Sequence, residues 1–162
     1  MYVALYVAER RDKERLATLG LVVVTLGAAL FVVGNAALPM LDLSKRYTVA
    51  TDGAERLALE HAARALLARG AHGSPGALLG FVMSGAGTLL MACAMSMGGA
   101  SGRRTAWPGI AGASLLLLYV FGTTFGLLPR AVLMTLASLG GVLMLVWYVV
   151  VARRLFALAR VS

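Results

Sequence analysis

The sequence has few of the residues from which most catalytic and metal-binding sites are built. It contains one cysteine, Cys93, two histidines, and only seven Asp and Glu against 15 Lys and Arg in 162 residues. A single cysteine excludes a disulfide framework, a Cys-x-x-Cys redox pair and a cysteine-ligated zinc site. Quinone-linked thiol oxidoreductases are therefore disfavoured, and the sequence predicts no metal site and no cofactor.

Charged side chains and histidines are missing altogether from four long stretches, residues 16–37, 77–97, 106–128 and 131–151. A helix rises about 1.5 Å per residue, so about twenty residues match the roughly 30 Å hydrocarbon core of a bilayer. The chain is also 60% hydrophobic, with a mean hydropathy of +0.84. The sequence therefore predicts an all-α polytopic membrane protein, with four transmembrane helices in a bundle plus one extramembrane amphipathic helix.

The lack of charge inside these spans also limits the function. Proton relays and ion pathways normally place Asp, Glu, His, Lys or Arg inside the membrane. Because no span holds a histidine, a b-type haem between the helices would have no ligands. The missing carboxylates argue against a transporter coupled to protons or cations.

The basic residues, which give the chain a net charge of +8, gather at the ends of the apolar stretches. This distribution fits a lipid surface and not a nucleic acid. Lys and Arg are more numerous in the N-terminal segment, residues 98–105 and the basic tail 152–162 taken together than in the other two loops. The sequence then predicts a multi-pass protein of the inner (plasma) membrane, and the positive-inside rule places both termini in the cytoplasm. Trp107 and Trp147 are predicted to lie in an interfacial aromatic belt near that side.

The N-terminal segment, residues 1–15, pairs an apolar run, MYVALYVA, with a charged run, ERRDKER. Eight helical residues extend only about 12 Å, which is too short to cross a bilayer. Two interpretations are open. The run is a half-helix lying in the interface or against a partner subunit, or the start codon has been assigned downstream of the true one.

The extracytoplasmic loop, residues 38–76, is predicted to hold one amphipathic helix over residues 52–69. Asp52 and Glu55 have the spacing of a capping box, and Gly70 follows the last turn. Apolar side chains recur at helical spacing on one face: Leu59, Ala62, Ala63, Leu66 and Leu67. We expect this helix to lie across the outer mouth of the bundle as a lid, a docking surface or a simple cover.

A family resemblance begins at this loop. The residues that carry it are Asn35, Leu43, Ser44, Tyr47, Ala50, Thr51 and Arg56. In this pattern the chain resembles an uncharacterised family of bacterial multi-pass membrane proteins with a domain of unknown function, over about residues 16–110. The resemblance implies a membrane location and a helical bundle, but no activity, cofactor or catalytic residue. Members of that family carry a further helix before the first span, which would make MYVALYVA the tail of that helix.

Small residues within the spans predict how the helices pack. Without a hydrophobic drive between helices in lipid, rows of small residues allow the close contacts that hold a bundle, or copies of it, together. The predicted packing positions are Gly20, Gly27, Gly34, Gly80, Ser84, Gly122, Gly126 and Gly140. Most Ser and Thr hydroxyls in the spans are expected to bond a carbonyl of their own helix.

Five polar residues are weak candidates for ligand binding, namely Asn35, Tyr47, Asp52, Arg56 and His61. No spacing among them matches a catalytic motif, so the sequence predicts no catalytic residue. The favoured function is a structural or accessory subunit of a larger membrane assembly, bound to other membrane subunits or to copies of itself. The alternatives are a carrier or channel for a neutral or lipid-like solute, and a membrane-embedded lipid-modifying enzyme.

Overall fold

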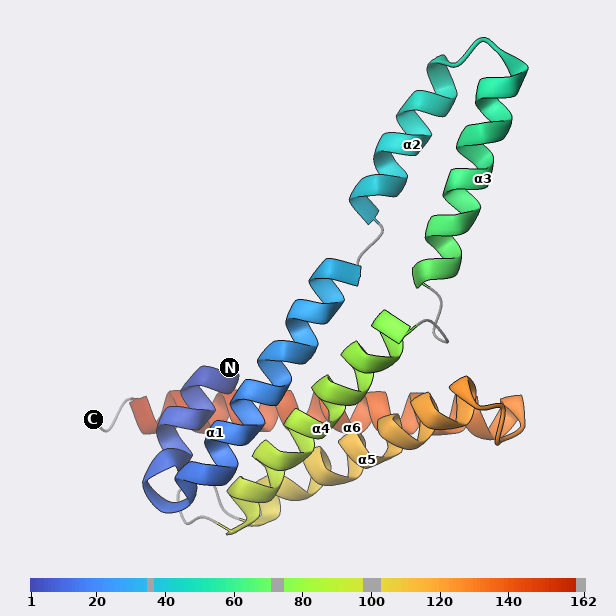
Figure 1. Cartoon of the computed structure of the whole chain (residues 1–162). Helices are drawn as coiled ribbons and strands as arrows, with labels where there is room; N and C mark the ends of the chain where they lie inside the picture. Colours follow the sequence, from blue (N-terminus) through green and yellow to red (C-terminus); the bar gives the residue numbers. More distant parts are fainter. Residues whose placement is uncertain (35–36, 71–74, 98–102, 160–162) are drawn as a thin grey trace.

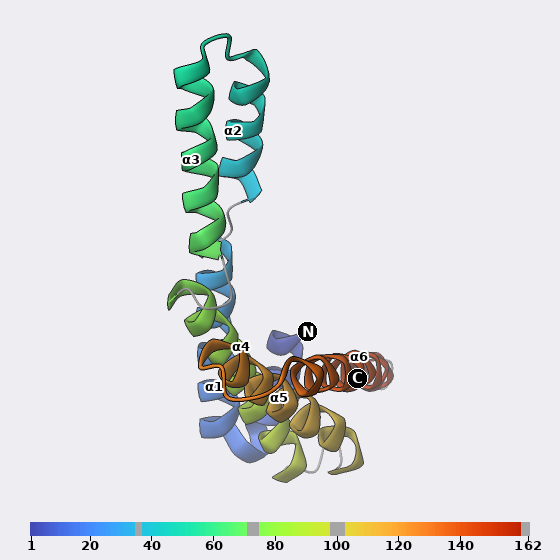
Figure 2. The ribbon, with the colours of Figure 1, turned by 90° about the vertical axis from the view of Figure 1, so that its right-hand side faces the viewer.

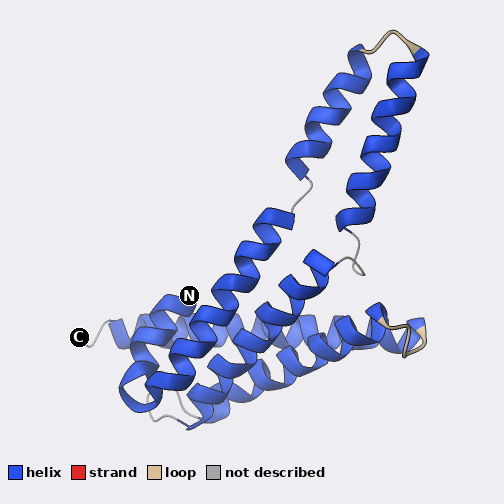
Figure 3. Ribbon diagram, in the orientation of Figure 1, coloured by secondary structure: helices blue, strands red, loops and turns tan. Residues whose placement is uncertain are grey.

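The computed structural model describes residues 1–34, 37–70, 75–97 and 103–159, and every regular element among them is a helix (Figures 1 and 3). This confirms the all-α prediction. The six helices are α1 (Tyr2–Gly34), α2 (Ala37–Val49), α3 (Gly53–Gly70), α4 (Pro75–Met97), α5 (Arg103–Thr124) and α6 (Arg130–Ala159).

Four helical segments are long and apolar enough to cross a membrane, in agreement with the sequence. They are Glu14–Val49, Gly76–Met97, Arg103–Thr124 and Arg130–Ala157. The first begins in α1 and ends in α2. Because α2 carries Asp42, Lys45 and Arg46, we place the hydrocarbon part of this segment in α1.

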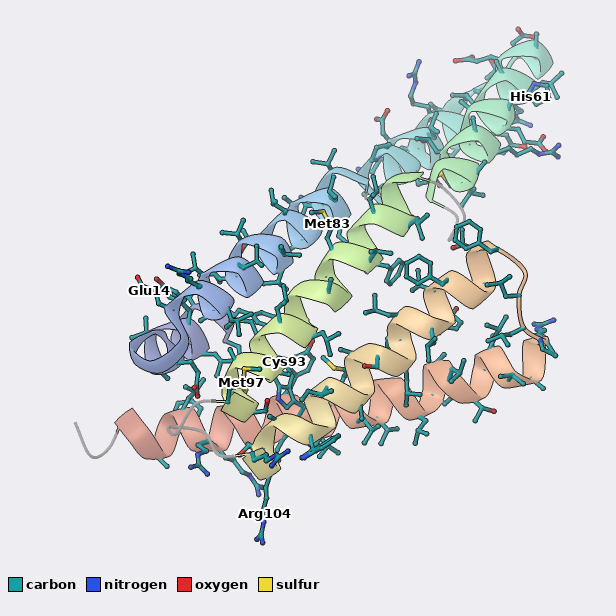
Figure 4. All side chains as sticks on the ribbon, turned by 60° about the horizontal axis from the view of Figure 1, so that its bottom comes forward. Glu14, His61, Met83, Cys93, Met97 and Arg104 are labelled. Atoms are coloured by element: carbon teal, nitrogen blue, oxygen red, sulfur yellow. The ribbon has the colours of Figure 1, made fainter. Side chains whose placement is uncertain are left out.

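The membrane helices form two antiparallel pairs, α1 with α4 and α5 with α6, which are joined by contacts between α4 and α5. Figures 1 and 4 show the pairs meeting at the end that carries Met97 and Arg104 and spreading apart toward the opposite end. The end at Met97 and Arg104 is called the closed end below. A buried core including Leu5, Met91 and Trp147 lies between the helices.

The α1–α4 pair depends on glycines that let the two backbones approach closely. A Cβ atom on Gly20 would come 2.8 Å from the Met91 side chain. Cβ atoms on Gly27 and Gly87 would overlap the backbone of the facing helix, at Ser84 and Val24 respectively. Small residues along both helices therefore set this interface, as expected for helices in lipid. Gly80 is looser, since a Cβ atom there would lie 3.4 Å from the Phe31 ring.

The α5–α6 pair also packs onto glycines, and one of them receives a tryptophan. A Cβ atom on Gly109 would lie 2.6 Å from Nε1 of Trp147, which is fully buried. Trp107, by contrast, is 57% exposed. Trp147 therefore does not face lipid as a side chain of an aromatic belt would, because the gap at Gly109 accommodates its indole in the core. A Cβ atom on Gly140 would lie 3.0 Å from the Leu116 side chain, so this glycine packs as predicted.

Three predicted packing glycines lie at or beyond the ends of their helices. Gly126 follows α5 with φ 63°, and the N–H of Leu127 donates to the carbonyl of Gly122 at 3.0 Å. This is the hydrogen bond of a Schellman motif, so Gly126 ends the helix and does not pack it. Gly122 does pack, because a Cβ atom there would lie 2.8 Å from the Leu133 side chain. A Cβ atom on Gly34 would meet nothing within 4 Å, so Gly34 makes no close contact among the described residues.

The N-terminal turns of α1 fold back into the bundle. Two distant parts of α1 reach the same place on α4. Val24 lies against Gly87, and the hydroxyl of Tyr2 lies 2.7 Å from that of the next residue, Thr88. In a straight helix Tyr2 and Val24 would be about 33 Å apart. Figure 1 shows the corresponding sharp bend near the start of α1. The interpretation that this segment lies in the interface or on a partner subunit is therefore corrected, because Leu5 is fully buried within the chain itself.

The loop after the first span contains two helices instead of the single one predicted. α2 and α3 form a hairpin, called the arm below, that projects away from the bundle (Figures 1 and 2). Part of the apolar face of α3 packs on α2, where Leu59 is buried, whereas Leu67 of the same face is exposed. This face therefore does not lie across the bundle mouth as expected. α2 begins with Ala37 and places Pro39 in its first turn, where a missing N–H costs no hydrogen bond.

The α1–α4 contact can be tested with two alanine substitutions. Gly87→Ala forces a methyl group against the α1 backbone at Val24, and we expect it to lower the free energy of unfolding by about 1–3 kcal/mol. Gly141→Ala is the control, since a Cβ there meets nothing within 4 Å, and should leave stability unchanged or raise it. Unfolding in mixed detergent micelles, followed by circular dichroism, measures both. Equal stability of the two variants would contradict the close contact.

Candidate functional site

Three of the predicted ligand-binding residues meet at the tip of the arm. Nε of Arg56 donates a 2.9 Å hydrogen bond to the carbonyl of Ala50, and the guanidinium carbon lies 5.8 Å from the centre of the Tyr47 ring. Oδ1 of Asp52 accepts a hydrogen bond from the N–H of Ala54 at 3.3 Å. These contacts cap the start of α3 and tie it to the end of α2.

The described residues that carry the family resemblance also lie along this hairpin. Leu43, Ser44 and Tyr47 of α2 face Leu59 and Ala63 of α3 across a small hollow of about 210 Å³. The carbonyl that accepts from the guanidinium belongs to a buried alanine. Part of the pattern therefore has a structural explanation, since Tyr47, Ala50 and Arg56 join the two helices of the hairpin.

Of the other two candidates, the structure describes only His61, which is not brought to this cluster. His61 is exposed on α3, at the place labelled in Figure 4, and Asn35 lies outside the described residues. Within the described ranges, no three His, Cys, Asp or Glu side chains are arranged to hold a metal ion. The ion pair between Glu60 and Arg64 lies on the exposed surface of α3.

A much larger cavity lies between the two helix pairs, in the space where they spread apart. Its volume is about 680 Å³, within the range of roughly 300–1,000 Å³ typical of small-molecule sites. α1, α4, α5 and α6 all contribute to its wall, together with the folded-back residues Met1, Tyr2 and Val3. None of the described residues that line it has a charged side chain. The cavity therefore suits an apolar or neutral molecule.

One polar group of side chains interrupts this apolar wall. The hydroxyl of Thr88 donates to the carbonyl of Ser84 at 2.7 Å, so its oxygen accepts from the hydroxyl of Tyr2 at 2.7 Å. The hydroxyl of Tyr148 lies 3.4 Å from that of Tyr2, which is long for an O–H···O hydrogen bond. We call the side chains of Tyr2, Thr88 and Tyr148 the hydroxyl cluster. Tyr148 is its outermost member and has the weakest hydrogen bond.

Sequence reasoning found this cluster only in part. Hydroxyls in the spans were expected to bond their own helices, and this is confirmed at Thr25, Thr88, Ser96 and Thr135. Tyr2 was missed, because residues 1–15 were not assigned to the bundle. The signal that would have found it is the apolar run MYVALYVA before the charged residues, because its side chains gain free energy when the bundle covers them.

The closed end of the bundle seals one side of the cavity. Leu5, Met91, Met95 and Trp147 are at most 1% exposed there. The centre of the Trp147 ring lies 6.2 Å from the centre of the Tyr2 ring and 5.5 Å from the centre of the Tyr148 ring. The hydroxyl cluster therefore lies between this packed end and the apolar part of the cavity.

The role of Arg56 can be tested by hydrogen exchange. Arg56→Ala removes a charge-assisted hydrogen bond worth about 1 kcal/mol at a partly exposed site, so amides of α2 and of the arm tip should exchange about fivefold faster. Arg64→Ala is the control, because its surface ion pair contributes little. Unchanged exchange in the Arg56 variant would show that the arm is held together without this contact.

Comparisons with known proteins add no relative: no family model matches the chain, and neither a curated protein nor a solved structure gives a significant match.

Proposed function

We propose that the chain is an accessory subunit of a larger membrane assembly, anchored by its four spans and attached to a partner protein through the arm. The observation that carries this proposal is the arm itself. It extends beyond the bundle, and among the described residues its few contacts with the bundle are mainly those of α3 with α4. A two-helix projection of this kind does nothing for the packing of the spans.

The surface of the arm supports a protein partner. Val49 is 76% exposed, Leu67 is 60% exposed and Leu57 is 55% exposed. These side chains lie among charged residues such as Glu60 and Arg64, which are too costly to place in hydrocarbon. Apolar side chains at a water-facing position gain free energy when a partner covers them.

The chemistry of the chain supports the same proposal. The polar residues at the arm tip are used to close the hairpin, and the cavity in the membrane is lined by neutral residues. Among the described residues, neither place gathers a nucleophile with an acid or a base, which a lipid-modifying enzyme would need. A subunit that positions other proteins requires no such group.

A carrier for a neutral or lipid-like solute is the second candidate, and the cavity is the observation that favours it. A carrier must open its site to both sides of the membrane in turn. The closed end is packed with fully buried side chains, Met95 and Trp147 among them. This packing favours a molecule that stays bound over one that passes through.

We also propose that both termini lie on the cytoplasmic side of the inner membrane, with Met1 folded back into the bundle on that side. Arg103 and Arg104 begin α5, and Arg153 and Arg154 lie near the end of α6, so these basic residues share the closed end of the bundle. The positive-inside rule places such an end in the cytoplasm.

The partner proposal is tested by purifying the full chain from its host membrane with a mild detergent and weighing the intact assembly by native mass spectrometry. We expect a stoichiometric partner protein. Val49→Gln combined with Leu67→Gln should lower its yield at least tenfold, whereas Arg64→Gln on the same arm should leave it within twofold. A bare monomer, a homo-oligomer, or a partner retained by the double variant would refute the proposal.

Orientation is tested by reporter fusions at the C-terminus. Green fluorescent protein fused after Ser162 should fluoresce, and alkaline phosphatase at the same point should be inactive, because the positive-inside rule keeps this end in the cytoplasm. The opposite pair of results would place the termini outside.

A further inference from the structure

We infer that the cavity between the two helix pairs is a binding site for a membrane phospholipid. One acyl chain fills the apolar part of the cavity, and an ester carbonyl of the lipid accepts a hydrogen bond from Tyr148. The lipid belongs to the leaflet at the closed end of the bundle. This inference rests on the cavity alone and is independent of the arm and its partner.

The depth of the hydroxyl cluster matches the ester region of that leaflet. Tyr148 lies five residues before Arg153 in α6, which is about 8 Å along the helix axis. Arginine side chains reach the head groups, and one interfacial region is roughly 5–8 Å thick. A carbonyl that lies just inside this region is therefore at the level of Tyr148.

The cavity is polar near the closed end, where the hydroxyl cluster lies, and apolar farther away. A lipid of that leaflet is likewise polar at its ester and apolar along its acyl chain. From the hydroxyl cluster the cavity continues along α4 from Thr88 toward Phe81, which lies about 10 Å farther from the closed end along the helix axis. There Phe31 and Phe81 meet edge to face, with ring centres 4.6 Å apart. A lipid with its ester at Tyr148 would thus point its acyl chain at these rings.

The hydrogen-bond directions leave a donor for the lipid. Thr88 donates to a backbone carbonyl and Tyr2 donates to Thr88, so both of their hydroxyl protons are used. The proton of Tyr148 has only the 3.4 Å contact with Tyr2, and Tyr148 is 36% exposed. Tyr148 can therefore turn its O–H toward an ester carbonyl, which is an acceptor without a proton of its own.

Because the described part of the cavity wall has no charged side chains, only the uncharged part of the lipid is expected to enter. A charged head group would lose its hydration in a wall made of apolar and hydroxyl side chains. The acyl chain and the ester are uncharged, and they can enter while the phosphate stays at the level of Arg153. A free neutral amphiphile, such as an isoprenoid quinone, shares this chemistry but carries no phosphate, and its mass distinguishes it from a phospholipid.

The test uses the full chain in nanodiscs of palmitoyl-oleoyl-phosphatidylglycerol, transferred to detergent, washed extensively and weighed by native mass spectrometry. We expect one phospholipid to remain bound per chain. Ala28→Phe places a ring in the cavity wall and should lower the bound fraction at least tenfold. Ala29→Phe is the matched control, since Ala29 is exposed like Ala28 but does not line the cavity, and should stay within twofold.

The hydrogen bond is tested by Tyr148→Phe, which keeps the ring and removes the donor. Loss of one such bond, about 1 kcal/mol, should weaken retention about fivefold in chains whose helical content is unchanged. Three results would overturn the inference: no bound lipid after detergent exchange, equal retention in the Ala28 and Ala29 variants, or a bound mass of a quinone in material from the host membrane.

Discussion

Helices in a bilayer gain nothing by hiding apolar surface from water, so their association depends on how closely their backbones can approach. In this chain the approach is set along α1 and α4, where Gly27 and Gly87 leave no room for a side chain. The position of α4 then decides where α5 can pack, and α5 with α6 forms the second pair. The cavity exists because these two tightly packed pairs touch at the closed end and diverge beyond it.

The folded-back residues of α1 connect the two pairs. Tyr2 bonds to Thr88 of the first pair and lies beside Trp147 and Tyr148 of the second. Leu5 belongs to the core cluster that joins them. The first turns of the chain thus complete the closed end, while Tyr2 also forms part of the cavity wall. The packing of the closed end and part of the cavity wall come from the same few residues.

The spans were predictable because a run of about twenty residues without charge is rarely placed anywhere but in a bilayer. A helix over residues 52–69, close to α3, followed from its cap and its apolar spacing. The sequence reasoning missed α2, which is short and carries Pro39 near its start. It also gave Gly126 a packing role, because a GxxxG pattern looks the same whether the helix continues or ends. The hydroxyl cluster was missed because residues 2, 88 and 148 are related by no local pattern, only by which helices meet.

The backward fold of the N-terminal turns has a consequence for biosynthesis. A ribosome makes Tyr2 and Leu5 before Thr88 and Trp147, so the contacts of these residues require helices that emerge only later. Tyr2 and Leu5 thus reach their final positions only after α4 and α6 have been made. Until α6 is inserted, this apolar stretch has no site in its own chain, and the membrane surface or an insertion factor must shelter it.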